Sequence, residues 1–484
     1  MRGRRGRVAL AIGALAAWLP ASAMGVSREP GLRTDISIAA LSEELERAIP
    51  QLMAEARVPG LAVAVVRGGE IAWTRGFGFA DRFTPVPVRA DTIFQVASNG
   101  KAVAGYAATR LVEQGALELD RALHDYLEVP FLPEGPHRSG ITLRRVLSHS
   151  AGLSNRVDGE GDRRSRFPPG ERFAYAGVGF SYLTAVIDAI DARGFEGALQ
   201  AEVLGPLHME SSTYALGASS TYALADPLRD RLAAGHVPAW MPPALFGALF
   251  AAASAVVWLV GWTVLRFGLR GRVTVRGAAL LLALSLALAV VAGSTLGGIP
   301  AALFCASVFV VPAAVVTGLW RATEGRPLLR TAAVGTALLA LAGVARSPMP
   351  LPRIPMTTVS AAFSLHASAP DLAHFLIEVM NPTLLSAESA RLYRTAQIRA
   401  GIDTSWGLGI GIAHTSEGDA VFHWGQNVGY ESLMVAYPEA GIGVVVLTNA
   451  AGGLAIVPDV AQLTQRGATS ASWAIEATSR PSRW

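Results

Sequence analysis

One serine and one lysine stand three residues apart in a sequence that contains no other lysine. Ser98 and Lys101 lie in the segment VASNGK, and the other strongly basic side chains are all arginines. An arginine keeps its proton at any useful pH, whereas a buried lysine can lose its proton and become a base. A serine hydroxyl needs a neighbouring base of this kind to become a nucleophile. The pair therefore makes covalent catalysis through a serine the first hypothesis.

The segment around this pair predicts a helix. From Ser98 to Gln114 the apolar residues recur at helical spacing, and Gly115 is a stop signal. Residues i and i+3 share one face of a helix, so the Lys101 amine can reach the Ser98 hydroxyl. Ser98 would open the helix, where the positive end of the helix dipole favours negative charge on the serine oxygen. The apolar residues on or near one face are Val103, Ala107, Leu111 and Val112.

Two further pairs of residues can take part in chemistry but also have structural explanations. Tyr175 and Gly177 precede a helical run, and His423 and Gly425 lie just before the last pair of predicted strands. Taken singly, the tyrosine fits a packed aromatic residue and the histidine a hydrogen-bonded strand residue. Only their combination with the serine and lysine gives them a functional interpretation.

The composition differs from that of an ordinary soluble protein. The chain has 484 residues, of which 16% are charged, and a mean hydropathy of +0.37, so membrane segments are expected. The net charge is +4 and the isoelectric point about 9.4, but the arginines do not form a basic stripe with aromatic residues. We therefore expect no nucleic-acid partner. Cys305 is the only cysteine, which excludes an intrachain disulfide and a cysteine metal cluster.

The first residues have the three parts of a secretory signal peptide. The basic segment MRGRRGR is followed by an apolar run from Val8 to Leu19 and by Ala21-Ser22-Ala23. We predict a signal peptide at residues 1–23 with cleavage after Ala23. An uncleaved anchor is the alternative, although the apolar run is short for a membrane span. Both interpretations place Ser98 outside the cytoplasm.

The strand patterns at the two ends of the remaining chain predict a single antiparallel sheet. An amphipathic helix at 38–56 precedes the first strands, which turn at Gly68-Gly69. The run from Asp120 to Ser212 is rich in turns and predicts a lobe of short helices beside the sheet. The predicted strands are 61–66 and 70–79 near one end and 433–437 and 442–449 near the other.

The middle of the chain contains three long stretches without charge. The second is 44 residues long, about 66 Å as a single helix, so it must fold back, most simply at 294–300. The third reaches marginal length with residues 328–330. We therefore predict a bundle of four transmembrane helices inserted at 237–346. The three stretches are 237–265, 277–320 and 331–345.

Charge placement sets the orientation predicted for the four spans. Arginines fill the first and third connections and the second connection carries no charge, so the positive-inside rule places the first and third in the cytoplasm. The predicted location is a multi-pass cell-membrane protein whose remaining domain faces the periplasm. A buried soluble core is the alternative to the spans, and Cys305 falls within the third span. The arginines are Arg266, Arg270, Arg272, Arg276, Arg321, Arg326 and Arg330.

Three short motifs, in order along the chain, resemble those of a known enzyme family. Ser98-x-x-Lys101, Tyr175-x-Gly177 and His423-x-Gly425 are similar to the three motifs of the penicillin-recognising serine hydrolases. The resemblance is to the branch that contains class C β-lactamases, D-aminopeptidases and esterases. The phrases VPGLAVAVVRGGEIAWTRGFG, ITLRRVLSHSAGL and HWGQNVGYESLMVAYPEAGIGVVVLTN are similar to that branch as well.

The resemblance covers residues 35–236 and 358–455 and leaves a C-terminal tail at 456–484. It implies an α+β fold, with a β-lactamase/transpeptidase-like antiparallel sheet, flanking helices and a helical lobe. The all-α transmembrane bundle would interrupt this domain.

The resemblance also implies catalytic roles. Ser98 would be the acylated nucleophile, Lys101 its proton acceptor and Tyr175 a proton shuttle in deacylation. Lys101 and Tyr175 form a coupled assignment, because which group deprotonates the serine differs between accounts of the superfamily. The backbone amides of Ser98 and Gln426 would form the oxyanion hole.

Gly177, His423 and Gly425 would line the substrate site. The family usually has an asparagine at the Gly177 position, and its amide contacts substrate and helps to orient the lysine, which a glycine cannot do. His423 replaces the lysine of the commonest third motif. A neutral imidazole would attract a drug carboxylate less strongly and make activity depend on pH through about pH 6 to 7.

These features together predict a membrane-tethered serine hydrolase that acts on small esters or D-amino-acid peptides and turns over penicillins poorly. A β-lactamase proper and a catalytically silent sensor or binding domain are the alternatives, and the spans lack the Asp, Glu, Lys or His expected of a transporter. The expected partners are a small-molecule ester, peptide or β-lactam and membrane lipid. We expect no cofactor and no metal, because His149, His414 and His423 lack short-range ligand spacing.

Overall fold

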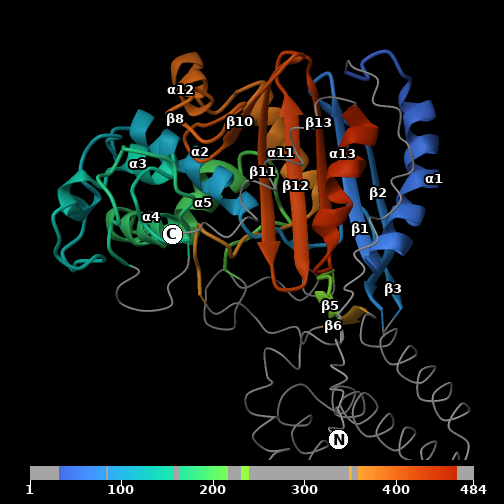
Figure 1. Cartoon of the computed structure of the whole chain (residues 1–484), viewed down its shortest axis with the longest axis horizontal. Coiled ribbons are helices and arrows are strands. Elements are labelled where there is room, and N and C mark those ends of the chain that lie inside the picture. Colours follow the sequence, from blue (N-terminus) through green and yellow to red (C-terminus); the bar gives the residue numbers. More distant parts are fainter. Residues whose placement is uncertain are drawn as a thin grey trace, which may run out of the picture.

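A nine-stranded antiparallel sheet runs through the centre of the domain and carries helices on both faces (Figure 1). The computed structural model describes residues 32–82, 85–155, 163–215, 231–238, 348–350 and 358–465. The strand order in the sheet is β3-β2-β1-β13-β12-β11-β10-β9-β8. These strands are β1 (Gly60–Arg67), β2 (Glu70–Asp81), β3 (Val86–Pro87), β8 (Ile398–Arg399), β9 (Thr404–Trp406), β10 (Gly411–Thr415), β11 (Gly418–Asn427), β12 (Tyr430–Tyr437) and β13 (Ile442–Thr448).

Strands β1 and β13, which are far apart in the sequence, are neighbours within this sheet, as the sequence predicts. β1 pairs antiparallel with β13, with Val63 opposite Val446 and Val65 opposite Val444. The predicted turn at Gly68-Gly69 joins β1 to β2, and both glycines have positive φ angles that favour a residue without a Cβ. Both predicted strand pairs and their common sheet are therefore confirmed.

Side chains of β1 alternate between two apolar layers. Leu61, Val63 and Val65 belong to one buried cluster, and Ala62 and Ala64 belong to the other. This period of two is the geometry of a strand that is covered on both faces.

Helices α1 (Ile38–Ala56) and α13 (Val457–Gln465) cover the first face. In α1, Leu41, Leu45 and Ile49 recur at helical spacing and are buried, and the Ser37 hydroxyl caps the first turn by accepting a hydrogen bond from the Ala40 amide. The predicted helix at 38–56 is confirmed at these bounds. Residues 457–465 pack on the sheet as α13, so the folded domain extends beyond the 455 boundary of the resemblance.

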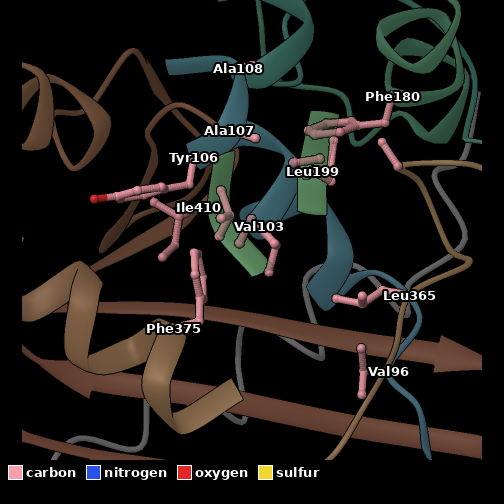
Figure 2. Packing of buried hydrophobic residues seen from close by; sticks show 14 of the residues in the cluster. Val96, Val103, Tyr106, Ala107, Ala108, Phe180, Leu199, Leu365, Phe375 and Ile410 are labelled. Carbon is pink, nitrogen blue, oxygen red and sulfur yellow. The ribbon is translucent and has the colours of Figure 1, made fainter. Parts of the chain in front are cut away.

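Helix α2 (Asn99–Glu113) lies on the second face, together with α11 (Ala369–Met380). Figure 2 shows Val103 and Tyr106 of α2 among Phe375 of α11, Ile410 and Leu199. The predicted helix is confirmed, but it is not apolar on one face only: its residues are buried on all sides from 99 to 109. A helix buried in this way is held at the centre of the molecule and can support a rigid site at its first turn.

Short helices form the predicted lobe beside the sheet, at the left of Figure 1. This part of the chain also brings a π-helical turn at 200–204 and 3-10 turns at 123–126 and 138–140. The lobe is therefore confirmed. Its α-helices are α3 (Leu143–Leu147), α4 (Gly177–Ile190) and α5 (Gly194–Leu199), and α12 (Ala387–Tyr393) lies near α2.

The predicted membrane insertion falls almost entirely outside the described residues. Its first two residues, Val237 and Pro238, belong to strand β5 (His236–Pro238), which pairs with β6 (Pro348–Pro350), so the first span cannot begin at Val237 as predicted. Among the helices of the described ranges, none is both long enough and apolar enough to cross a bilayer. The signal peptide at 1–23, the rest of the spans and Cys305 also lie outside the described residues.

Candidate active site

Ser98 occupies the N-cap position of α2 and is half-buried. The residue before it, Ala97, has a φ of 49°, a left-handed conformation that costs energy for a residue with a Cβ. Hydrogen bonds hold this turn against the sheet. The Asn99 side chain donates to the Ser432 hydroxyl of β12 at 2.7 Å and to the Val96 carbonyl at 3.2 Å. The chain therefore turns sharply into the helix and presents Ser98 at its positive end.

Lys101 follows one turn later and is brought to Ser98 as the sequence predicts. Its Nζ atom lies 2.7 Å from Ser98 Oγ, and the side chain is only 2% exposed. Burial lowers the pKa of Lys101 from its ordinary value of 10.5 to about 7. Near neutral pH a large fraction of the amine is therefore unprotonated and can accept the serine proton.

The carbonyl oxygen of Ala362 completes this group, although no sequence pattern indicates it. Lys101 Nζ donates to it at 2.5 Å, and Ser98 Oγ lies 3.4 Å from it. The segment that carries Ala362 is held in place by a hydrogen bond from the Ala361 amide to the Thr184 hydroxyl of α4. A backbone acceptor has no residue-type signature, so no pattern in the sequence could identify this contact.

Tyr175 lies against the lysine. Lys101 Nζ is 5.1 Å from the centroid of the tyrosine ring, and Ser98 is near enough to influence the pKa of Tyr175. Burial raises that pKa above its ordinary value of 10.0, and this effect exceeds the opposing effect of Ser98. The Tyr175 hydroxyl has no hydrogen-bond partner of ordinary geometry within the described part of the chain. The phenol is therefore protonated near neutral pH and positioned to shuttle a proton, whereas Lys101 is the better base.

Strand β11 brings Gly425 and Gln426 to the same site. A Cβ on Gly425 would lie 2.1 Å from the Val96 carbonyl oxygen, so only glycine permits this close approach of β11 to the turn before Ser98. β10 pairs with β11 only up to Phe422, so among the described strands residues 423–427 pair with β12 alone. Their other edge therefore pairs with no described strand, which is compatible with the predicted role of the Gln426 amide in an oxyanion hole.

His423 differs from the expectation. Its side chain is 0% exposed, its Nδ1 donates to the Trp424 carbonyl at 2.7 Å, and its ring packs 6.2 Å from that of Tyr175. Burial lowers the pKa of His423 to about 3, with a further lowering by Lys101. The imidazole is neutral throughout the physiological range, so the predicted pH dependence through pH 6 to 7 cannot come from His423.

Gly177 is the first residue of α4, two residues after Tyr175. A Cβ at this position would lie 2.5 Å from the backbone oxygen of Asn155 and 3.2 Å from its Oδ1. Asn155 therefore occupies the space that a side chain at Gly177 would need. Asn155 thus fills the place of the side chain that motif two lacks. No local pattern in the sequence indicates this contact.

The arrangement can carry out acyl transfer. A half-buried serine lies at a helix N-terminus, a buried amine of lowered pKa lies within hydrogen-bond distance, and a protonated phenol lies beside both. These are the nucleophile, base and acid that such a reaction needs. The predicted residues Ser98, Lys101, Tyr175 and Gly425 are brought together. The same region holds a further buried histidine, His149, for which the sequence predicts no catalytic role.

A family model described as Beta-lactamase matches residues 45–303 and 309–468. The chain is 21% identical to Protein flp of Staphylococcus aureus (strain NCTC 8325 / PS 47) over 189 residues, which cover 36% of this chain and 38% of that protein. It is 27% identical to Esterase EstB of Burkholderia gladioli over 219 residues, 39% of this chain and 55% of the esterase. Both alignments span less than two thirds of the relative.

Solved structures show the same fold. The octameric penicillin-binding protein homologue from Pyrococcus abyssi has a TM-score of 0.55 at 19% identity and covers 85% of this chain and 74% of its own. D-alanine carboxypeptidase AmpC from Burkholderia cenocepacia has a TM-score of 0.56 at 14% identity and covers 88% and 99%. The antiparallel sheet with flanking helices is therefore of the β-lactamase and penicillin-binding-protein type.

Proposed function

Because this chain belongs to the beta-lactamase family, we propose that it is a serine hydrolase that forms an acyl-enzyme at Ser98. The observation that carries the proposal is the contact between Lys101 and Ser98. A lysine that is 2% exposed, 2.7 Å from a serine hydroxyl and of pKa about 7 is arranged as a base. A lysine kept only for structure would be expected to pair with a carboxylate, whereas this one bonds a hydroxyl and a carbonyl.

The reaction that this geometry supports has two halves. Neutral Lys101 accepts the Ser98 proton as Oγ attacks the substrate carbonyl, and the backbone amides of Ser98 and Gln426 stabilise the oxyanion. Collapse expels the leaving group, which takes a proton from Lys101 through the Tyr175 hydroxyl. Water then attacks the acyl-enzyme and passes a proton to the same pair of groups. That proton moves on to Ser98 Oγ as the bond between Oγ and the acyl carbon breaks, which releases the carboxylic acid and restores Ser98.

We propose small esters or D-amino-acid peptides as substrates. Gly177 supplies no amide to hold the side chain of a β-lactam, and the space beside it is filled by Asn155. Losing one positioned amide lowers the rate roughly 5- to 150-fold and leaves the nucleophile and base intact. The names of an esterase and a D-alanine carboxypeptidase among the similar proteins support this choice. A β-lactamase proper is the alternative.

We also propose that residues 239–347 attach the hydrolase to the cell membrane, with the site on the periplasmic side. The long stretches without charge support this, and so does the β5–β6 pair, which joins the chain just before and just after the insertion. A domain whose flanking segments pair in this way can accept an insertion without separating its two halves.

One comparison of purified full-length protein tests the hydrolase proposal. We expect labelling by a fluorophosphonate and hydrolysis of p-nitrophenyl esters, both lost in Ser98→Ala, with slow turnover of nitrocefin. Nitrocefin turnover at kcat/KM of roughly 10⁴ M⁻¹s⁻¹ or more with no ester hydrolysis would identify a β-lactamase instead. An unlabelled wild-type protein without either activity would identify a silent binding domain.

A further inference from the structure

His149 is a buried histidine beside the candidate active site, and the proposed reaction does not use it. It lies in the turn after α3, is 0% exposed, and has a φ of 55°, in the left-handed region. A buried residue with a Cβ in this conformation requires strong support from its surroundings.

Its contacts surround Tyr175. The backbone amide of Ala174 donates to the His149 carbonyl at 2.7 Å, and that of Ala176 donates to His149 Nδ1 at 3.0 Å. The two residues on either side of the tyrosine are thus bound to one histidine. The histidine ring also packs against the tyrosine ring, with centroids 4.2 Å apart and planes tilted by 35°.

The same contacts define the state of the histidine. Because Nδ1 accepts the Ala176 proton, the neutral ring carries its own proton on Nε2. Burial and the nearby Lys101 and His423 lower the pKa of His149 well below its ordinary value, so the ring does not gain a proton near neutral pH. A protonated ring would lose the Nδ1 acceptor and place a second positive charge beside the lysine.

We infer that His149 is a positioning residue for Tyr175: by bonding Ala174 and Ala176 it holds the phenol ring against Lys101 and beside Ser98. This inference rests on the proposed function. It assigns the strained turn a role in proton transfer and predicts which atom matters, the Nδ1 acceptor.

The matched variants are His149→Asn and His149→Leu. Asparagine tolerates a positive φ and its Oδ1 can take the place of Nδ1, whereas leucine has a similar size but no acceptor. In ester hydrolysis we expect His149→Leu to lower kcat about 5- to 100-fold with KM within about threefold, since a buried amide is left unpaired and the phenol shifts. We expect His149→Asn to stay within about threefold of wild type.

Repeating the His149 substitution in a protein that already carries Tyr175→Phe distinguishes a positioning role from a general loss of structure. If His149 acts through Tyr175, then adding His149→Leu to the Tyr175→Phe variant should lower kcat by less than about threefold. Equal losses in both backgrounds, or equal losses in the asparagine and leucine variants, would overturn the inference. Should the leucine variant not fold, His149→Gln replaces it, because its longer amide reaches the Nε2 place and not the Nδ1 place. Fluorophosphonate labelling of wild type, measured beside these variants, tests the proposed function separately.

Discussion

The Nζ atom of Lys101 lies 2.5 Å from the carbonyl oxygen of Ala362, which is 261 residues further along the chain. The lysine and serine of the site precede the insertion and this carbonyl follows it. The site is therefore complete only when the two parts of the domain have assembled. The contact also fixes the amine without a carboxylate, and this is why burial can lower the pKa of Lys101 to about 7.

The first prediction is that activity depends on pH through Lys101. The base form of the lysine increases as pH rises through its folded pKa of about 7, so kcat/KM for an uncharged ester should rise through that region and level off above it. His423 and His149 add no step there because burial lowers the pKa of both. We expect the same profile from a His423→Gln variant that retains measurable activity.

The pKa itself can be measured directly because the sequence contains only one lysine. Protein labelled with ¹³C at the lysine ε carbon should give a single lysine signal that titrates near pH 7 in the native state and near pH 10.4 in denaturant. A native signal that titrates near pH 10 would contradict the assignment of Lys101 as base.

The second prediction concerns the nucleophile and base. Ser98→Ala should remove fluorophosphonate labelling, and Lys101→Arg should lower ester hydrolysis by roughly 100-fold or more, because a buried arginine cannot accept the proton. Ser42→Ala on the surface of α1 is the control and should keep wild-type activity, since its hydroxyl donates to the Ala39 carbonyl of the same helix, away from the site. Circular dichroism of each variant checks that it is folded. Wild-type rates in Lys101→Arg would contradict the mechanism.

Much of the fold follows from sequence patterns that have a direct physical cause. The alternation in β1 and the glycines at 68 and 69 give two strands and their turn, because strands repeat every two residues and tight turns favour glycine. The helix at 98–114 follows from its spacing, but its complete burial does not, since small residues such as alanine fit a core and a surface equally well.

The site was predictable where residue type carries the chemistry. Ser98 and Lys101 could be paired because i and i+3 are neighbours on a helix. The Ala362 carbonyl, the burial of His423 and the loop at Asn155 depend on how distant segments pack, and no local pattern encodes them. The only sequence feature that draws attention to His149 is its position in the segment HSAG, where it lies among small residues.

The third prediction is that an asparagine at position 177 does not create a β-lactamase. The Asn155 backbone oxygen would lie 2.5 Å from the new Cβ, so the loop must move, at a cost of about 1 to 3 kcal/mol of stability. Gly177→Asn should therefore unfold at lower urea concentration than wild type without faster nitrocefin turnover. Gly135→Asn is the matched control, because a Cβ there meets no atom within 4 Å. A stable Gly177→Asn variant with much faster nitrocefin turnover would show that the asparagine alone had been missing.

The last prediction concerns membrane topology. Because β5 pairs with β6 and Lys101 bonds Ala362, the chain before 239 and the chain after 347 belong to one domain. Under the proposed membrane attachment, both parts lie on one side of the membrane. We therefore expect the proposed insertion to cross the membrane an even number of times, with the arginines near position 271 in the cytoplasm. With Cys305 changed to serine, single cysteines at Gly271 and at Ile402, which is 84% exposed, report the two sides.

An impermeant maleimide added to intact spheroplasts should label the cysteine at 402 and should label that at 271 only after lysis. The cysteine-free protein, treated in the same way, gives the background. Equal labelling of both positions before lysis would place them on the same side and contradict the four-span insertion. Labelling of 271 alone would invert the orientation, placing Ser98 in the cytoplasm and contradicting the proposed periplasmic site.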